Sequence, residues 1–191
     1  AIMRVIPNMR VLVPADSTTV SKLTWIIAQQ YGPFYMRMAR SKTPIIHNDS
    51  QEFQIGKGIV LRDGSDCTIA ACGITVKMAL DAANMLQQDG ISCRVIDCFS
   101  IKPIDRDLLE KSARETGSIV TCEEHNIIGG FGSAVSEVVS ESYPVPIRRI
   151  GVQDKFGESA RDSEIPQLLE KHGLTSINIA KAVKEVRSKK T

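Results

Sequence analysis

The sequence lacks the features that would place it in a membrane, on nucleic acid or around a structural metal. No apolar run approaches the roughly 18 residues that a membrane-spanning helix needs, and we identify no signal peptide. The 24 basic and 22 acidic residues are well mixed, so the net charge of +2 provides no patch for nucleic acid or an anionic membrane. None of the five cysteines forms a CxxC pair, and no metal-ligand spacing occurs. We therefore expect a cytoplasmic protein with buried, reduced thiols and no nucleic-acid or membrane partner.

What is present suits a globular protein of one or two domains. With 191 residues, of which 42% are apolar, the chain can bury a core without a disulfide or metal. The chain starts at Ala1 rather than at a methionine, and its first residues resemble the middle of a longer sequence. We expect a processed, proteolysed or truncated product.

Residues 9–40 are expected to form a β-α-β unit. The pattern predicts strands over 9–13 and 34–38 and a helix over 18–31 that Asp16 or Ser17 caps. Two strands joined in this way should lie parallel, with a right-handed crossover. The residues expected to face inward are Val20, Leu23 and Ile27, with Trp25 as a further candidate. Two strands and one helix cannot bury their own faces, so this unit needs missing sequence or another chain to complete its sheet.

Residues 41–57 are typical of a linker, and residues 58–191 of a complete domain. The expected strands of this domain lie at residues 58–61, 67–72, 93–98, 118–122 and 145–150. The expected helices lie at residues 75–88, 104–116 (capped by Asp105), from 133 onward, 163–172 and 177–186. Such alternation predicts an α/β fold with three layers, α/β/α, around a mostly parallel sheet. The tight turn over 62–65 joins the first strand to the second, which indicates one antiparallel edge strand.

The segment 118–133 has the order of strand, polar residues, glycine turn and helix in which α/β proteins usually place ligands. Glu123, Glu124 and His125 follow the apolar run at its carboxyl end. Acid/base catalysis by His125 is one interpretation. Because no nucleophile motif lies beside it, we favour a hydrogen-bonded loop or interface role for the three residues.

The glycine turn Gly129-Gly130-Phe131-Gly132-Ser133 also allows two interpretations. It could hold a phosphate at the amino end of the following helix. It matches neither GxGxxG nor GxxxxGK[ST], so we favour a tight turn with close helix–sheet packing. Of the other histidines, His47 is expected in a loop and His172 at a helix end, where His172-Gly173 is similar to a C-cap.

Two arginines mark the end of the second strand, in YMRMARSK. Strand alternation places Arg37 and Arg40 on different faces. Arg40 lies just past the carboxyl end of the strand, where ligands bind in such sheets, and a guanidinium suits a phosphate or carboxylate. A surface or interface arginine is the alternative.

Six stretches, in order over nearly the whole chain, resemble the C-terminal part of transketolase, the thiamine-diphosphate enzyme of the pentose phosphate pathway. They are IMRVIPNMRVLVPAD, GPFYMRMARSK, GKGIVLRDGSDCTIAACG, IDCFSIKPIDRDLLEKSA, IVTCEEHNIIGGFGSAVSEV and GVQDKFGES. Related thiamine enzymes share this C-terminal domain, among them deoxyxylulose-phosphate synthases and the β subunits of 2-oxo-acid dehydrogenases. HNIIGGFGSAV and VQDKFGES are most similar to the short transketolases that are split into two subunits.

The resemblance implies a division of the chain among the three domains of the family. Residues 1–40 resemble the tail of the pyrimidine-binding domain, 41–57 form the linker, and 58–191 resemble the whole C-terminal domain. The GDG motif for metal and diphosphate, the glutamate that activates the cofactor and the aromatic residues that hold its ring belong to upstream sequence. The resemblance therefore implies thiamine diphosphate and a divalent metal, Mg or Ca, in the complete enzyme, with neither bound by this chain alone.

One functional residue carries over from the family. The arginine of its SR or AR segment binds the sugar phosphate, and here that segment is Ala39-Arg40-Ser41. Arg40 is thus the candidate substrate-binding residue, and no residue of this chain is expected to be catalytic. Glu123, Glu124 and His125 match a recurrent acidic-histidine segment to which we assign no catalytic role.

The sequence leads to three functional hypotheses. The first is a fragment or subunit portion of transketolase, a transferase of two-carbon ketol units between sugar phosphates. Under this hypothesis the chain is inactive by itself and needs the N-terminal part or subunit. It also contributes to a homodimer through its C-terminal and pyrimidine-binding domains. The second is part of a deoxyxylulose-phosphate synthase or a 2-oxo-acid dehydrogenase β subunit. The third is a non-enzymatic α/β interaction module.

Overall fold

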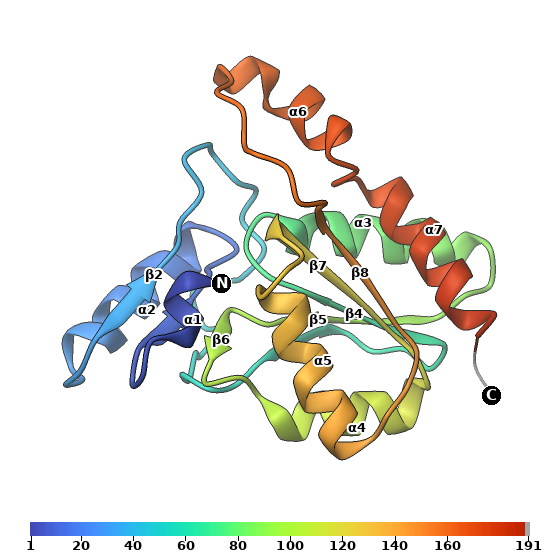
Figure 1. The fold of residues 1–191 in the computed structure, drawn as a ribbon, viewed down its shortest axis with the longest axis horizontal. Helices are drawn as coiled ribbons and strands as arrows, with labels where there is room; N and C mark the ends of the chain where they lie inside the picture. The colour runs from blue at the N-terminus through green and yellow to red at the C-terminus, as the bar shows by residue number, and fades with distance from the viewer. Residues whose placement is uncertain (190–191) are drawn as a thin grey trace.

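Two β-sheets that lie side by side organise the protein. The computed structural model describes residues 1–189, so Lys190 and Thr191 of the expected C-terminal domain lie outside the described residues. A three-stranded sheet takes two of its strands from the first 40 residues, and a five-stranded sheet forms the larger part (Figure 1). Three of the four pairings in the larger sheet are parallel, which confirms the predicted α/β class.

The first 40 residues form the predicted β-α-β unit. Strands β1 (Arg10–Leu12) and β2 (Phe34–Met36) pair in parallel, and helix α2 (Ser17–Ala28) connects them. The helix begins after Asp16, whose carboxylate accepts the backbone N–H of Thr19 at 2.8 Å and confirms the predicted cap. Leu23 is fully buried, but Trp25 is 70% exposed. The expected inward position of Trp25 is wrong, because two helical steps turn it to the side opposite Leu23.

Two short elements in this part were not expected from the sequence. Helix α1 (Ile2–Val5) precedes β1, and strand β6 (Ser100–Lys102) pairs antiparallel with β1. The third strand of the small sheet therefore comes from later in the same chain rather than from missing sequence or another chain. Strand β2 stays at the edge of this sheet, with no further partner strand among residues 1–189.

The large sheet has the order β3-β5-β4-β7-β8. Its strands are β3 (Ile59–Arg62), β4 (Cys67–Ala71), β5 (Cys93–Asp97), β7 (Ile119–Asn126) and β8 (Ile147–Val152). Strand β3 is the predicted antiparallel edge strand, but it pairs with β5 and not with β4, the next strand along the chain. Both edges of β4 are occupied by parallel strands, so the free edge of β5 is the one that β3 joins.

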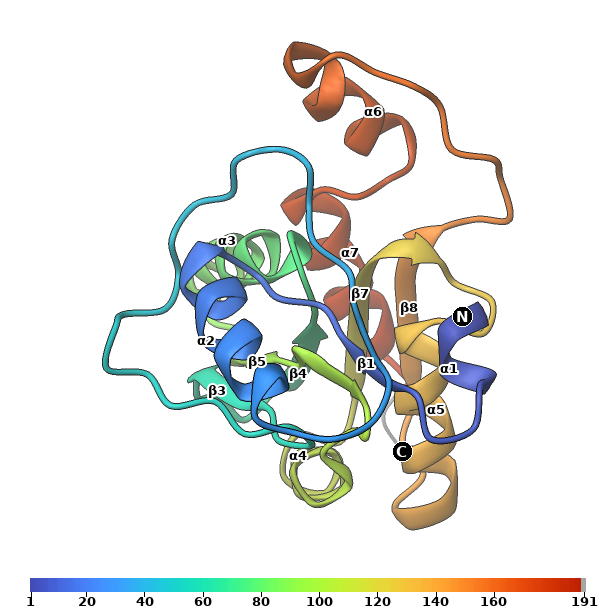
Figure 2. The same ribbon diagram turned by 90° about the vertical axis from the view of Figure 1, so that its left-hand side faces the viewer.

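Helices cover both faces of the large sheet, as the predicted three-layer arrangement requires. Helices α3 (Thr75–Gln88) and α7 (Ser176–Arg187) lie on one face, and α4 (Arg106–Thr116) and α5 (Phe131–Ser142) on the other (Figures 1 and 2). The first two cover a core that includes Leu86 and Val183, and the second two a core that includes Leu109 and Val135. Fully burying each such side chain stabilises the fold by roughly 1.5–3 kcal/mol.

Residues 41–57 contain no helix or strand, as expected of a linker, but polar contacts fix them to the rest of the molecule. The carboxylate of Asp16 accepts the backbone N–H groups of Ile46 and His47 at 2.7 and 2.8 Å. His47 has the predicted loop backbone, yet its side chain is buried and its Nε2 lies 2.8 Å from Oδ2 of Asp97. The ring of Phe53 packs edge-on against His47, so the linker is part of the core between the two sheets.

The end of the chain forms an arm that stands away from the sheet. The short helix η1 (Asp162–Glu164) and helix α6 (Ile165–Lys171) replace the single helix expected over 163–172 and project outward in Figure 1. The predicted C-cap at His172-Gly173 is present, with Gly173 at φ +74°. In residues 1–189 we find no helix whose length and apolar character would let it span a bilayer.

Candidate functional site

Two cavities open at the carboxyl edges of the strands. In the large sheet the chain runs from β4 to β5 on one side and returns to β7 on the other, so the direction of winding switches between β4 and β7. The inner cavity, about 220 Å³, lies at this switch point, between Cys72 and Gly73 after β4 and the carboxyl end of β7. Residues of α1, β1, β2 and the start of α5 complete its wall.

Glu123, Glu124 and His125 belong to strand β7 and not to the loop that the sequence predicts. Strand β7 continues to Asn126, which pairs with Val152 of β8 after a register irregularity beyond Cys122. Pairing with β8 thus extends β7 beyond its apolar residues. The three side chains alternate along this end of the strand and have different partners.

Glu123 caps helix α5. Its buried carboxylate accepts the backbone N–H groups of Phe131 at 2.6 Å and Gly132 at 2.8 Å. Burial raises the pKa of Glu123, although these two N–H groups act in the opposite direction. The anion site of the glycine turn is therefore occupied by the protein's own carboxylate. A Cβ on Gly132 would lie 2.7 Å from Oγ1 of Thr121, which supports the favoured interpretation of a turn with close helix–sheet packing.

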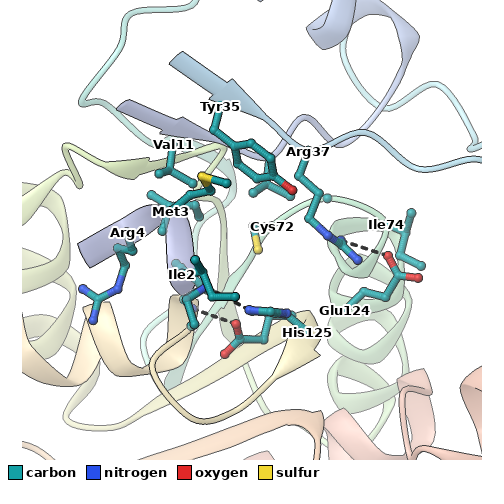
Figure 3. A pocket seen from close by; sticks show the side chains of 17 residues that line it. Ile2, Met3, Arg4, Val11, Tyr35, Arg37, Cys72, Ile74, Glu124 and His125 are labelled. Atoms are coloured by element: carbon teal, nitrogen blue, oxygen red, sulfur yellow. Dashed lines mark hydrogen bonds and ion pairs between the residues drawn. The ribbon is translucent and has the colours of Figure 1, made fainter. Parts of the chain in front are cut away.

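Glu124 points to the opposite side and pairs with Arg37. The Oε2 atom of Glu124 lies 3.1 Å from Nη1 of Arg37, which follows β2, so the pair joins the two sheets (Figure 3). Both side chains are about one third exposed, at 35% and 37%. Tyr35 lies beside the pair on the small-sheet side of the inner cavity. The sequence predicted Arg37 at the end of a strand. It did not predict the pairing with Glu124, because 87 residues separate the two side chains.

His125 lies at the wall of the inner cavity, where its Nε2 is 2.9 Å from the terminal nitrogen of Ala1. Burial, followed by the Ala1 ammonium and Arg37, lowers the pKa of His125. A neutral imidazole at this place could accept a proton. The thiol in the same cavity, Cys72, is 4% exposed and burial raises its pKa, so it is a poor nucleophile. The inner cavity thus contains a potential base, His125, and the ion pair of Arg37 and Glu124. Its thiol, Cys72, is not suited to act as a nucleophile.

Arg40 lies apart from these residues. It lines the outer cavity, about 610 Å³, between the linker, the start of α3 and the arm. Its guanidinium donates to the carbonyl of Ala160 at 2.9 Å and pairs with Asp162 at 2.8 Å. Strand β2 ends at Met36, so both arginines follow it and strand alternation does not apply to them; Arg37 lines the inner cavity and Arg40 the outer one. Glu124 lines both cavities.

Comparison with known proteins identifies the family of this chain. The family model described as transketolase, C-terminal domain, matches residues 56–179. The 6-deoxy-6-sulfo-D-fructose transketolase subunit of Clostridium sp. (strain MSTE9) is 42% identical over 190 residues, which cover 100% of this chain and 58% of that subunit. The 1-deoxy-D-xylulose-5-phosphate synthase of Heliobacterium modesticaldum is 36% identical over 189 residues, covering 97% of this chain and 29% of the synthase.

A solved structure extends the likeness to the three-dimensional fold. The structure titled split gene transketolase, inactive beta4 tetramer, is 48% identical and superimposes with a TM-score of 0.95. The likeness covers 99% of this chain and 61% of that one. The chain thus spans about three fifths of the length of the transketolase subunits that it matches. It belongs to the transketolase family and corresponds to the C-terminal part of the family's proteins.

Proposed function

We propose that this chain is the C-terminal portion of an enzyme that transfers a two-carbon ketol unit between sugar phosphates with thiamine diphosphate. In this proposal residues 1–40 are the end of the pyrimidine-binding domain, 41–57 the linker and 58–191 the C-terminal domain. The observation that carries the proposal is that the similarity to split transketolases continues through all three segments, at 48% identity over 99% of the chain.

The proposal places the cofactor and its divalent metal, Mg or Ca, in the upstream part of the enzyme. Among residues 1–189, no three His, Cys, Asp or Glu side chains meet in an arrangement that could hold a metal ion. The anion site at the start of α5 is filled by Glu123, so it offers a diphosphate no free backbone donors there. The described residues therefore do not fit the diphosphate and metal, and no step of the reaction is assigned to them.

Arg40 is the residue of this chain that we propose to contact the substrate. It follows β2 at the carboxyl edge of the small sheet and lines a cavity large enough for a sugar phosphate. Lys42 lines the same cavity and adds positive charge. The paired, planar N–H groups of a guanidinium match the oxygens of a phosphate or a sulfonate. The name of the Clostridium relative refers to a sulfo-sugar.

The partners proposed for this chain are an N-terminal transketolase part or subunit and a second copy of the assembled enzyme. The exposed edge of β2 supports an upstream partner, because a strand with unpaired backbone groups favours continuation of the sheet. In the dimer the C-terminal domain would act in assembly. Glu123, Glu124 and His125 would then serve as structural groups near the interface between the two sheets.

A reconstitution experiment tests this function. The chain, its N-terminal partner and their mixture are each assayed for ketol transfer from a ketose phosphate to an aldose phosphate, with thiamine diphosphate and Mg²⁺. We expect activity in the mixture alone, and calorimetric binding of the cofactor in the mixture but not in the isolated chain. Tight cofactor binding by the isolated chain would contradict the proposal, and an inactive mixture would favour a non-enzymatic α/β module.

The similarity to a deoxyxylulose-phosphate synthase supports a second candidate function. The name of that synthase states its product, 1-deoxy-D-xylulose 5-phosphate, and a 2-oxo-acid dehydrogenase β subunit would act on a 2-oxo acid. Formation of that product or turnover of a 2-oxo acid by the reconstituted mixture, without turnover of ketose phosphates, would replace the proposed transketolase activity with one of these.

A further inference from the structure

The guanidinium of Arg40 is already engaged by the protein itself. Both of its contacts are made by the same nitrogen, Nη2, which donates to the carbonyl oxygen of Ala160 at 2.9 Å and to Oδ1 of Asp162 at 2.8 Å. Ala160 and Asp162 lie 120 and 122 residues further along the chain. They belong to the arm, which covers residues 153–171, and lie in its segment 153–164 between β8 and α6.

The choice of nitrogen matters because of the shape of a guanidinium. A phosphate binds arginine most strongly by accepting two parallel N–H bonds. One such fork uses Nε and Nη2, and the other uses Nη1 and Nη2. Nη2 carries two hydrogens, one for each fork, and two acceptors from the arm meet this nitrogen. While the arm holds this position, neither paired mode of phosphate binding is open at Arg40.

The arm is held by few contacts and could be displaced at low cost. Helices η1 and α6 contain no buried residue, and Phe156 in the arm is 98% exposed. The side chains of Arg40 and Asp162 are 70% and 74% exposed. Solvent screens an ion pair so exposed, and the carboxylate of Asp162 accepts from a single nitrogen of the guanidinium. A phosphate that accepts two parallel N–H bonds can therefore compete with this carboxylate for Arg40.

We propose that Asp162 is a latch on Arg40: its carboxylate occupies the anion site of the empty protein, and a phosphorylated substrate must displace it. The inference rests on the proposed role of Arg40 and adds a competitor for that residue within the same chain. Displacement of Asp162 frees the arm, so binding of the phosphate and release of residues 153–164 are one coupled event. By this coupling Asp162 lowers the affinity for every anion that needs Arg40.

The arm contains its own reporter, because Lys155 precedes Phe156 and forms a trypsin site within it. Cleavage after Lys155 is measured on the full chain with inorganic phosphate, against chloride at matched ionic strength. Release of the arm should accelerate cleavage by up to about fivefold, the factor that corresponds to an exposed ion pair. Asp162→Asn and Arg40→Ala should each accelerate it without phosphate, and phosphate should then have no further effect.

Kinetics of the reconstituted enzyme provide the second readout. Asp162→Asn should lower the KM for the phosphorylated acceptor by up to about fivefold and leave the KM for an unphosphorylated aldose unchanged. The matched control is Asp154→Asn, which removes another carboxylate of the arm that bonds to Asn126 and not to Arg40. This control should leave the KM for the phosphorylated acceptor unchanged.

The two readouts separate the latch from the proposed function. If Arg40→Ala raises the KM for phosphorylated sugars but Asp162→Asn changes neither KM nor cleavage, the latch is overturned and the substrate role of Arg40 stands. If phosphate accelerates cleavage through Arg40 but Arg40→Ala leaves every KM unchanged, Asp162 still competes with anions for Arg40, but the substrate role of Arg40 is lost. Equal effects of Asp162→Asn and Asp154→Asn on the KM would also overturn the latch, because they would indicate a general effect of arm charge.

Discussion

Two adjacent glutamates of β7 provide a test of how the candidate site is built. Glu123 is 2% exposed and accepts the backbone N–H groups of Phe131 and Gly132 at the start of α5. Glu124, the next residue, is half-buried and pairs with Arg37. Glu123→Ala and Glu124→Ala therefore compare two losses of stability at neighbouring positions. The first variant removes a buried helix cap, and the second removes a partly exposed ion pair.

The expected cost of Glu123→Ala follows from the two donors that it would leave buried and unpaired. Each unsatisfied N–H costs roughly 1–3 kcal/mol, so the loss of both partners should lower the free energy of unfolding by about 2–6 kcal/mol. Glu124→Ala should cost at most about 1 kcal/mol, because solvent screens its pair with Arg37. Glu123→Gln keeps an acceptor oxygen and should fall between the two alanine variants.

Urea unfolding followed by circular dichroism measures these differences. The raised pKa of Glu123 adds a signature: its contribution to stability should decline as pH rises above 4.5, because the folded protein retains the proton longer than the unfolded chain. Glu123→Gln should lack this decline. Equal losses for the two alanine variants would refute the assignment of Glu123 as the cap of α5.

Three further predictions concern groups that are buried or partly buried. Asp97→Ala should destabilise the fold by about 3–5 kcal/mol in thermal or urea unfolding, because His47 would lose its partner in the core, and a loss below about 1 kcal/mol would contradict this. Because the pKa of His125 is lowered from 6.5, acidification through pH 6.5 should lower the free energy of unfolding of the wild-type chain but not that of His125→Gln. Equal pH profiles of the two proteins would contradict this prediction. The five buried thiols, with burial raising the pKa of Cys93 to about 12, should react with a thiol reagent only after unfolding; rapid reaction of the native chain would contradict their burial.

Local sequence patterns were sufficient for the elements that local chemistry determines. Helix α3 occupies the predicted residues 75–88, because its apolar spacing and Gly90 define both ends. Asp105 caps α4 and accepts the N–H of Leu108, as predicted, because a cap acts within one helical turn. The glycine turn at 129–133 has the favoured packing role, although its contacts with Thr121 and Glu123 come from strand β7.

Features that depend on distant partners were missed. Strand β6 exists because β1, about 90 residues earlier, offers it an edge, and β7 extends past its apolar run because β8 lies beside it. The burial of His47 depends on Asp97, 50 residues away, and the pairing of Arg37 with Glu124 spans 87 residues. No local sequence pattern encodes such contacts. Most of the site residues could therefore be predicted from the sequence, but their contact partners could not.

The measurement that tests the account most directly is the effect of Arg40→Ala on the kinetics of the reconstituted enzyme. Loss of a charge-assisted contact, roughly 1.5–3 kcal/mol, should raise the KM for phosphorylated sugars by about 10- to 150-fold, with little change for unphosphorylated sugars or in kcat. Arg37→Ala is the matched control, because that arginine lines the other cavity and pairs with Glu124. Equal losses of activity on phosphorylated and unphosphorylated sugars would contradict the claim that this chain contacts the phosphate through Arg40 while the chemistry takes place upstream.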